Sequence, residues 1–443
     1  MKRVVIIGGA SAGATCAFEL RKLDKNVKIL ILEKSNYTQY SPCAMPYVLS
    51  GEIVDFEKIF IFNKKDYESN NILLNLNSEV IDIDKNKRSI TYKSNKEQKE
   101  IIYNKLVIAT GSSSFVPKIK GLENEDYFVL KSIDDAKKIA EKIKTKSNSI
   151  IIGGGLIGVE LAVSLSEKGE KVTLIESKEN ILSSMLDSDM VLKLKESIEG
   201  KNLKIIENIN IKEIAKKKII LDDLEIKFDK LFVCTGIKLN LELVKKAEID
   251  VDKGIVVNEH MQTSNKDIFA CGDCTESVEF NSGEKILSAL GTTAVRQAKI
   301  IAQNITGNNI KFAPVLNNTI SKIGNIFVGS VGLTKNRCDE LKIKTVSALY
   351  TGNVRAEYYP SKSKITIKII CDMKGLILGA QILGDEEVVG RIDLMALALQ
   401  KKCKIDELMK LETCYNPASA PIFDPITIVS EICFKKLNFL NKN

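Results

Sequence analysis

The chain has 443 residues, enough for about three domains, and its 44% apolar and 28% charged residues are ordinary for a globular protein. Its formal charge of +8 comes mainly from lysines spread along the chain, which argues against a dedicated nucleic-acid surface. A single histidine excludes most histidine-based chemistry, and ten scattered cysteines suit a reducing compartment better than a disulfide framework. No segment reaches the ~18 uninterrupted apolar residues of a membrane span, so we predict a soluble, cytoplasmic protein that binds neither membrane nor nucleic acid.

The N-terminal segment follows the plan of a βαβ unit. β-branched residues predict a strand at 3–7, a loop with three glycines follows at 8–13, apolar periodicity predicts a helix at 14–23, and a second strand is predicted at 27–32. That strand ends at Glu33, whose carboxylate is placed to accept hydrogen bonds from ribose hydroxyls.

The same plan returns further along the chain. A strand is predicted at 149–152, a glycine loop at 153–158, a helix at 159–167 and a strand at 171–175, followed by Glu176. One glycine loop alone is weak evidence, but two loops, each between a strand and a helix and each followed about 20 residues later by an acid, predict two dinucleotide sites.

The glycines have a physical reason at these positions. A pyrophosphate approaches the backbone at a helix N-terminus, where free N–H groups and the helix dipole favour negative charge and a Cβ would block the approach. In the first loop Ala10 replaces the middle glycine, and alanine is the smallest substitution available. An ordinary strand–turn–helix with a glycine loop is the alternative interpretation.

Beyond residue 315 the pattern of predicted elements changes. Short strands rich in isoleucine and valine are predicted at 326–331, 345–350, 364–370 and 376–383, followed by a helix at 386–400 and a final helical stretch. This pattern predicts a separate α+β domain.

One cysteine stands apart in the segment Tyr40-Ser41-Pro42-Cys43-Ala44-Met45-Pro46-Tyr47, with no other cysteine within five residues on either side. The nearby proline predicts a helix start, where the helix dipole stabilises a thiolate. A buried inert cysteine is the alternative. If Cys43 is redox-active, its partner is a sulfur from outside the segment or an oxygen, in a sulfenic acid.

These residues together resemble the FAD- and NAD(P)H-dependent pyridine nucleotide–disulfide oxidoreductases, specifically the single-cysteine branch with coenzyme A-disulfide reductases, NADH oxidases and persulfide reductases. The resemblance covers essentially the whole chain. It includes the turns Ala109-Thr110-Gly111 and Cys234-Thr235-Gly236, the segment 263–273 ending in Asp273, and the helix start at 291–297. Val48 occupies the position where two-cysteine relatives carry the second sulfur, so the two-cysteine mechanism is excluded.

The resemblance implies an α/β fold with two Rossmann-like dinucleotide-binding domains and a C-terminal α+β dimerisation domain. It assigns 1–110 and 245–315 to an FAD domain, 111–244 to an NAD(P) domain and 316–443 to the dimerisation domain of a homodimer. In this family the acid matching Asp273 bonds the flavin ribitol, and the acid matching Glu160 lies near the nicotinamide. The implied cofactor-binding residues are Gly8, Ala10, Ser11, Gly13, Glu33, Lys34, Thr110, Gly111, Asp273, Ala294, Gly153, Gly155, Ile157, Gly158, Glu160, Glu176 and Gly236.

The resemblance also implies a catalytic set. The C-terminal histidine–glutamate pair of glutathione-reductase-like enzymes is absent, and Tyr359 and Tyr415 lie in segments that reach across a dimer to the partner's redox cysteine, here Cys43. A phenol donates a proton or hydrogen bond to sulfur without a histidine. Tyrosines that only pack at a dimer interface are the alternative.

Residues matching the coenzyme A site imply a thiol substrate. Oxidase and peroxidase relatives carry a histidine in the first glycine loop where this chain has Ser11, which also favours a thiol. Asn70 and Phe423 stand where lysines are expected to meet the substrate phosphates, so the identity of the thiol stays open. The implied substrate-binding residues are Thr15, Glu19, Lys22, Gln39 and Pro42.

The sequence therefore predicts an FAD-dependent NAD(P)H oxidoreductase that reduces a small disulfide or persulfide through Cys43. Glu176 favours NADH, with NADPH as the alternative. An NADH oxidase that reduces oxygen through a Cys43 sulfenic acid and a non-catalytic redox sensor are the other hypotheses. Cys271 and Cys274 form a C-x-x-C inside the FAD motif, where we expect no metal site, and His260 matches no catalytic histidine of the family.

Overall fold

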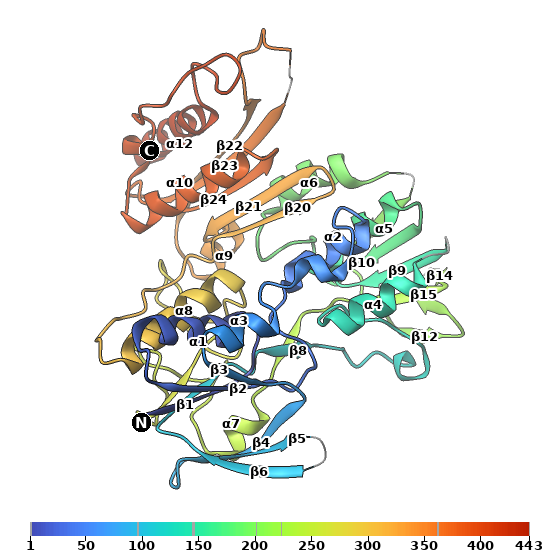
Figure 1. Cartoon of the computed structure of the whole chain (residues 1–443). Coiled ribbons are helices and arrows are strands. Elements are labelled where there is room, and N and C mark those ends of the chain that lie inside the picture. Colours follow the sequence, from blue (N-terminus) through green and yellow to red (C-terminus); the bar gives the residue numbers. More distant parts are fainter. Residues whose placement is uncertain are drawn as a thin grey trace.

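The computed structural model describes residues 2–94, 97–143, 147–200, 202–222, 224–360 and 363–442. It has three parts, each built on its own main sheet (Figure 1). The part that holds the N-terminus is called the first unit below, the mainly green part is the second unit, and the orange and red part is the C-terminal domain.

The first unit is built on a parallel sheet with the strand order β17-β7-β1-β2-β3. These strands are β1 (Arg3–Ile7), β2 (Lys28–Leu32), β3 (Ile72–Asn75), β7 (Lys105–Ile108) and β17 (Ile268–Ala270). One face is covered by α1 (Ser11–Leu23) and α8 (Gly291–Ile305), which pack against each other. The other face is covered by β4 (Ser78–Asp84), β5 (Ser89–Ser94), β6 (Glu97–Ile102) and α7 (Glu242–Lys246). Because β17 follows the whole second unit in sequence, the chain leaves this sheet after β7 and returns to complete it.

The second unit repeats the arrangement with the strand order β11-β10-β9-β15. Its parallel strands are β9 (Asn148–Ile152), β10 (Lys171–Ile175), β11 (Leu203–Ile206) and β15 (Lys230–Val233). Helices α4 (Ile133–Lys142), α5 (Leu156–Glu167) and α6 (Ser188–Ile198) cover one face, and β12 (Glu213–Ala215), β13 (Lys218–Ile220) and β14 (Glu225–Lys227) cover the other. An antiparallel pair, β8 (Ser112–Ser114) with β16 (Ile237–Leu239), forms the double connection between the units.

The C-terminal domain has an antiparallel sheet with the order β20-β21-β24-β23-β22. Its elements are β20 (Thr319–Ile323), β21 (Ile326–Gly332), α9 (Lys335–Glu340), β22 (Thr345–Asn353), β23 (Lys364–Asp372), β24 (Ile377–Gly384), α10 (Val388–Gln400), α11 (Ile405–Leu408) and α12 (Pro425–Lys442). Helices α10 and α12 cover one face. From the opposite face Val328 and Leu383 join the hydrophobic core of the second unit, so this sheet is buried on both sides.

The segment that carries Cys43 lies between these parts. It forms the 3-10 turn η1 (Pro42–Ala44) and the short helix α2 (Met45–Ser50), with Pro46 in the first turn of α2. Met45 and Leu49 belong to the core of the second unit, because α2 packs against α5 and α4. Figure 1 shows α2 beside α5.

A buried ion cluster also holds the second unit to the C-terminal domain. The Lys368 ammonium of β23 lies 2.9 Å from the Asp187 carboxylate and 2.7 Å from that of Asp189, just before and within α6. The Gln381 side-chain amide donates to Asp187 at 2.7 Å, and the backbone N–H groups of Lys335 and Asn336 also donate to it. Burial opposes ionisation of Asp187, but the hydrogen bond and charge of Lys368 outweigh it and lower the pKa of Asp187.

The predicted three-part α/β architecture is confirmed. Strands 3–7 and 171–175 have the predicted bounds, while α1 and α5 each begin three residues earlier than predicted, inside the glycine loops. Strand β20 was not predicted, because only five residues of a polar stretch form it and its apolar side chains are sparse. The domain boundaries at 110/111, 244/245 and 315/316 stay a prediction.

Candidate active site

The two glycine loops have the same close contacts. A Cβ on Gly13 would lie 1.9 Å from the carbonyl oxygen of Gly8, and a Cβ on Gly158 would lie 2.0 Å from that of Gly153. Both contacts let the first turn of a helix pack directly on the preceding strand end. The middle position differs, because nothing lies within 4 Å of a Cβ built on Gly155. The equivalent Ala10 therefore fits without displacing protein atoms.

The acid that ends each second strand bonds back to its own loop. Glu33 accepts from the backbone N–H of Gly9 at 2.7 Å, and Glu176 accepts from that of Gly154 at 2.6 Å. Lys34 follows Glu33 on the surface, and Ile157 is 39% exposed in the first turn of α5. These bonds fix each carboxylate beside the helix N-terminus where the sequence predicts a nucleotide ribose.

The starts of α1 and α5 are open to an anion. Ala10 and Gly155 are the N-cap residues, and no side chain caps either helix. Their first N–H groups therefore have no side-chain acceptor, and the space above Gly155 is free of protein atoms. Free N–H groups at a helix N-terminus with open space before them can bind a pyrophosphate. The residues present therefore fit two dinucleotide cofactors.

Three distant segments meet at the predicted flavin site. A Cβ built on Gly272, which has φ +84°, would lie 3.3 Å from the Cβ of Ala12 and 3.9 Å from that of Ala294 at the start of α8. The Gly272 N–H donates to the side chain of Gln297 at 2.8 Å. The N-termini of α1 and α8 are therefore brought to the same edge of the first sheet as Asp273.

Asp273 belongs to a small polar cluster. The Ser112 hydroxyl donates to the Asp273 carboxylate at 2.7 Å, and the Lys131 ammonium lies 3.2 Å from the same oxygen and 2.7 Å from the Ser112 hydroxyl. Lys131 was not predicted as a site residue. Lys131 directly precedes the capping box of α4, and that motif predicts a helix start but no role for the lysine.

The connections between the units have the predicted turns. Gly111 has φ +61° and Gly236 has φ +107°, and both have open space where a Cβ would stand. Asn240 ties the turns together, since its side-chain amide donates to the Thr110 carbonyl at 2.8 Å and its own carbonyl accepts from the Thr110 hydroxyl at 3.1 Å. The left-handed backbone at both glycines explains why the sequence uses them there.

Cys43 is open to solvent, yet its packed surroundings desolvate the thiol. Burial together with the carboxylates of Glu160 and Asp273 raises the pKa of Cys43, against an opposite effect of Lys131. The backbone N–H of Cys43 at the helix start also lowers the pKa of the thiol, in the expected direction, but this effect is outweighed. Desolvation and the two carboxylates raise the pKa of Cys43 by more than the single 3-10 turn lowers it.

Helix α5, which carries Glu160, packs on α2, and the charge of Glu160 acts on Cys43. Burial raises the pKa of this carboxyl to about 7, and a hydrogen bond with Ser321 opposes the rise. The Ser321 hydroxyl of β20 donates to the Glu160 carboxylate. Neither Ser321 nor its strand was predicted from the sequence.

The predicted substrate residues fall into two groups. Thr15, Glu19 and Lys22 share one face of α1, where Glu19 and Lys22 form an ion pair at 3.5 Å. Pro42 begins η1 beside Cys43, and Gln39 is 8% exposed with a buried side-chain oxygen that has no hydrogen-bond partner among the described residues. That oxygen is suited to a donor from a bound molecule.

The predicted tyrosines lie in the C-terminal domain, where Tyr415 is exposed and Tyr359 is half-buried. The Tyr415 hydroxyl is 2.7 Å from that of Tyr358, and this hydrogen bond raises the pKa of Tyr415. The residue predicted from the sequence is the neighbouring Tyr359, whose backbone N–H donates to the Ala356 carbonyl. Within the described part of the chain, no hydrogen bond or ion pair joins either predicted tyrosine to Cys43.

Cys271 and Cys274 are buried, and the Cys274 thiol donates to the Cys271 carbonyl at 3.3 Å. All ten cysteines are free. No group of three metal-ligating side chains occurs in the ranges given above. Among the described helices, none combines the length and apolar character needed to cross a bilayer.

Comparison with known proteins identifies the family of this fold. Residues 2–298 match the family model of pyridine nucleotide-disulphide oxidoreductases, and residues 321–424 match the dimerisation domain of the same family. The chain belongs to the pyridine nucleotide-disulphide oxidoreductase family. It is 36% identical over 445 residues to a protein of Methanocaldococcus jannaschii named NADH oxidase, covering 98% of this chain and 99% of the relative.

Other members of this oxidoreductase family are similar over the whole chain. A coenzyme A disulfide reductase of Staphylococcus aureus is 29% identical, covering 98% of this chain and 100% of the relative. The structure of an NAD-dependent persulfide reductase from A. fulgidus superposes with a TM-score of 0.95 at 29% identity, covering 99% of this chain and 84% of that one. The family uses FAD and NAD(P)H, and the two open helix starts, Asp273 and the acid-tethered loops fit these cofactors.

Proposed function

We propose that this oxidoreductase reduces a small-molecule disulfide or persulfide, as a coenzyme A-disulfide reductase does, through the single sulfur of Cys43. One observation carries the proposal. Cys43 is open to solvent beside Asp273 and Lys131 at the predicted flavin edge, and Val48 on α2 leaves it without a neighbouring sulfur. The partner sulfur must then arrive with the substrate.

The residues of the chain have separate tasks in this reaction. The Cys43 thiolate attacks one sulfur of the disulfide, the S–S bond of the substrate breaks, and a thiolate leaves as Cys43 enters a mixed disulfide. Bound FAD supplies the two electrons, taken from NAD(P)H, that reopen this mixed disulfide. Lys131 supports the negative charge on Cys43, and Gln39, Pro42 and the exposed face of α1 offer contacts to the thiol.

The Cys43→Ser variant tests the proposal. It should lose disulfide and persulfide reduction but keep bound FAD and the bleaching of FAD by NADH, because the cysteine acts after hydride transfer. Cys414→Ser, which changes the other exposed cysteine, should turn over as wild type does. Disulfide turnover near the wild-type rate in Cys43→Ser would place the redox centre elsewhere.

An NADH oxidase is the second candidate, favoured by the 36% identical relative of that name. In that reaction an oxygen in a Cys43 sulfenic acid takes the place of the substrate sulfur. Oxygen consumption with NADH alone, at a rate above that of disulfide reduction, would favour it. Trapping of Cys43 by a sulfenic-acid reagent during turnover would support the same conclusion.

A homodimer with shared sites is the second part of the proposal. The C-terminal domain matches the dimerisation domain of the family. The large apolar side chains that it exposes include Tyr358, Val389, Leu397, Tyr415, Ile422 and Phe423. We propose that this domain binds a second copy and that Tyr415, with Tyr358 or Tyr359, donates a proton to the thiolate leaving from the partner's Cys43.

Mixed dimers test the shared site. If Tyr415→Phe alone is impaired, co-expression of Cys43→Ser with Tyr415→Phe should restore one of the two sites in each heterodimer. Verified heterodimers without recovered turnover, or a fully active monomer, would contradict it. A cytoplasmic location, which suits ten free cysteines, completes the proposal and is tested by cell fractionation.

A further inference from the structure

Two buried cysteines lie side by side in the core of the C-terminal domain. Cys371 is on β23 and Cys433 is on α12, and both side chains are 0% exposed. Their sulfur atoms are 3.6 Å apart, which is too close for another atom to stand between them. The two residues are 62 positions apart in the sequence, and neither belongs to the site around Cys43.

The fold holds both sulfurs over the same point of the sheet. Cys371 is paired in register with Val346 of the neighbouring strand β22. The Cys433 sulfur is also 3.9 Å from the carbonyl oxygen of Val346. Three residues later on α12, the Lys436 ammonium donates to the Ser347 carbonyl at 3.1 Å. These contacts place α12 directly over the Cys371–Val346 pair.

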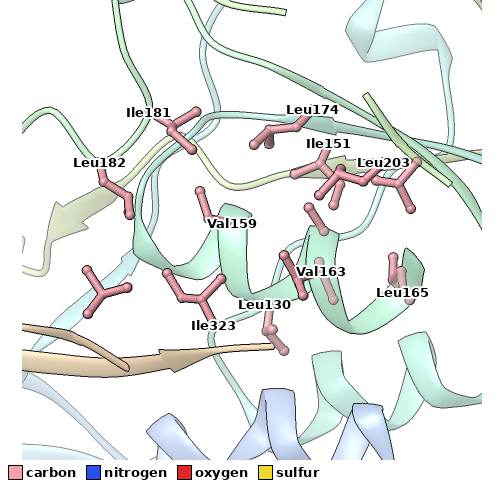
Figure 2. Close-up of a cluster of buried hydrophobic side chains, with 14 of the residues drawn as sticks. Leu130, Ile151, Val159, Val163, Leu165, Leu174, Ile181, Leu182, Leu203 and Ile323 are labelled. Atoms are coloured by element: carbon pink, nitrogen blue, oxygen red, sulfur yellow. The ribbon is translucent and has the colours of Figure 1, made fainter. Parts of the chain in front are cut away.

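Both cysteines occupy core positions that aliphatic side chains usually fill. Cys371 ends a row of alternate β23 residues that are otherwise isoleucines, and Cys433 lies in the buried stripe of α12 between Val429 and Leu437. In the core of the second unit, by comparison, the labelled side chains are all leucine, isoleucine or valine (Figure 2). A single buried cysteine acts as a small apolar residue. Two cysteines in contact can also join in a disulfide.

The hydrogen bond between the two thiols makes them chemically unequal. With Cys371 as the donor, this bond lowers the pKa of Cys433, and the charge of Lys436 adds to the effect against the opposing effect of burial. The same bond and burial raise the pKa of Cys371. Cys433 is therefore the thiol that ionises first and attacks a disulfide.

The end of α12 gives a small molecule a route to Cys433. Leu437 is the last buried residue of this helix, and residues 438–442 are all exposed. Asn441 reaches the sheet through a hydrogen bond at the surface, to the Met373 carbonyl at 3.4 Å. Chain ends open locally at low cost. Because Cys433 lies one turn before Leu437, unwinding of the final turns exposes its sulfur.

We propose that Cys371 and Cys433 form a disulfide when a low-molecular-weight disulfide is in excess, and that this bond ties α12 to β23. The Cys433 thiolate attacks one sulfur of the small disulfide, whose S–S bond breaks, and the first thiolate leaves. Cys371 then loses its proton and attacks the Cys433 sulfur, so that the second thiolate leaves. The two protein thiols are oxidised, the small disulfide is reduced, and the two cysteine protons end on the two released thiols.

The native contacts suit this bond. The sulfurs of a disulfide are about 2.0 Å apart, so each sulfur needs to move by only about 0.8 Å. The closed loop is long, and closing it restricts the unfolded chain. Strand β23 also carries Lys368 of the buried ion cluster, so the bond connects the final helix to the strand that contacts the second unit. The reaction goes beyond the proposed turnover at Cys43, because no electron passes through FAD or NAD(P)H.

The test is oxidation of the FAD-bound protein by 2-hydroxyethyl disulfide in the absence of NADH. Samples are then unfolded in N-ethylmaleimide, digested without reductant and analysed by mass spectrometry. We expect a peptide that links Cys371 to Cys433, whereas Cys338, which is equally buried in the same domain, is recovered as its N-ethylmaleimide adduct. The melting temperature of the oxidised protein should rise by roughly 5 °C or more.

Single substitutions separate this bond from other oxidation. In Cys371→Ala and in Cys433→Ala the linked peptide should be absent and the rise in melting temperature lost, while Cys338→Ala should behave as wild type does. Cys414 is exposed and should form a mixed disulfide in all of these proteins, so its modification reports that the reagent is active. Bound FAD absorbance and circular dichroism show that each variant is folded.

Absence of the linked peptide from wild-type protein in which Cys414 is fully modified would overturn the proposal. A link that forms only in urea-unfolded protein would also overturn it. A melting temperature that falls as the link forms, or a rise that persists in Cys433→Ala, would show that the bond does not stabilise the native fold. The result is independent of disulfide turnover at Cys43, so failure of the proposed function leaves this measurement interpretable.

Discussion

Replacing Lys368 by Met removes the cation of the ion cluster between the second unit and the C-terminal domain and keeps most of the apolar stem. Lys368 and Asp187 are 5% and 4% exposed, so the change leaves a carboxylate buried without its partner. Breaking such a pair costs about 3–5 kcal/mol. Asp187 keeps the Gln381 amide and two backbone donors of α9, so we expect the lower end, about 3 kcal/mol.

Urea unfolding followed by circular dichroism measures this loss, and Lys364→Met, on the exposed start of the same strand, is the control. In wild type the lowered pKa of Asp187 contributes stability above its unfolded pKa of about 3.9, which is lost as pH falls through the folded value. In the variant, burial without a cation favours the protonated acid, so the deficit should shrink from pH 7 towards about pH 5. A loss under about 1 kcal/mol, typical of a surface pair, or a deficit that grows on acidification, would refute the reasoning.

Three further outcomes are expected. Gly158→Ala should abolish flavin reduction by NADH while FAD stays bound, because its Cβ would lie 2.0 Å from the carbonyl oxygen of Gly153, whereas Gly200→Ala, where nothing lies within 4 Å of the added Cβ, should keep it; equal rates in both variants would contradict this. NADH should be preferred modestly over NADPH, and Glu176→Ala should narrow the ratio of the two kcat/KM values, since the carboxylate repels a 2′-phosphate; a strong NADPH preference in wild type would refute it. Lys131→Met should slow alkylation of the redox cysteine at pH 8, because Lys131 acts to lower its pKa, and the exposed Lys138→Met should not.

The glycine loops and the acids after them could be predicted because their geometry is local. A Cβ on Gly13 would lie 1.9 Å from the Gly8 carbonyl oxygen, so the position requires glycine, and the acid follows after one helix and one strand. The same holds for the turns at Gly111 and Gly236, whose backbone is left-handed. Cys43 could be named as the candidate redox residue because its segment has no second cysteine.

The surroundings of Cys43 could not be predicted in the same way. The charges of Lys131 and Glu160 act on its thiol from elements far apart in sequence, and Ser321, on a third element, donates a hydrogen bond to Glu160. These arrangements depend on how three sheets pack together. Their effect reversed the predicted direction of the Cys43 pKa shift. Tyr358 was missed because adjacent residues in a loop have no periodicity that tells which side chain meets Tyr415.

Reoxidation of the NADH-reduced protein shows which oxidant takes electrons from this enzyme. The protein is reduced without oxygen and mixed in stopped flow with coenzyme A disulfide, glutathione disulfide, a persulfide or dissolved oxygen, while flavin absorbance reports the rate. We expect a disulfide or persulfide to reoxidise the flavin faster than oxygen does, and Cys43→Ser to abolish this advantage. Fastest reoxidation by oxygen, or an advantage that survives in Cys43→Ser, would contradict it.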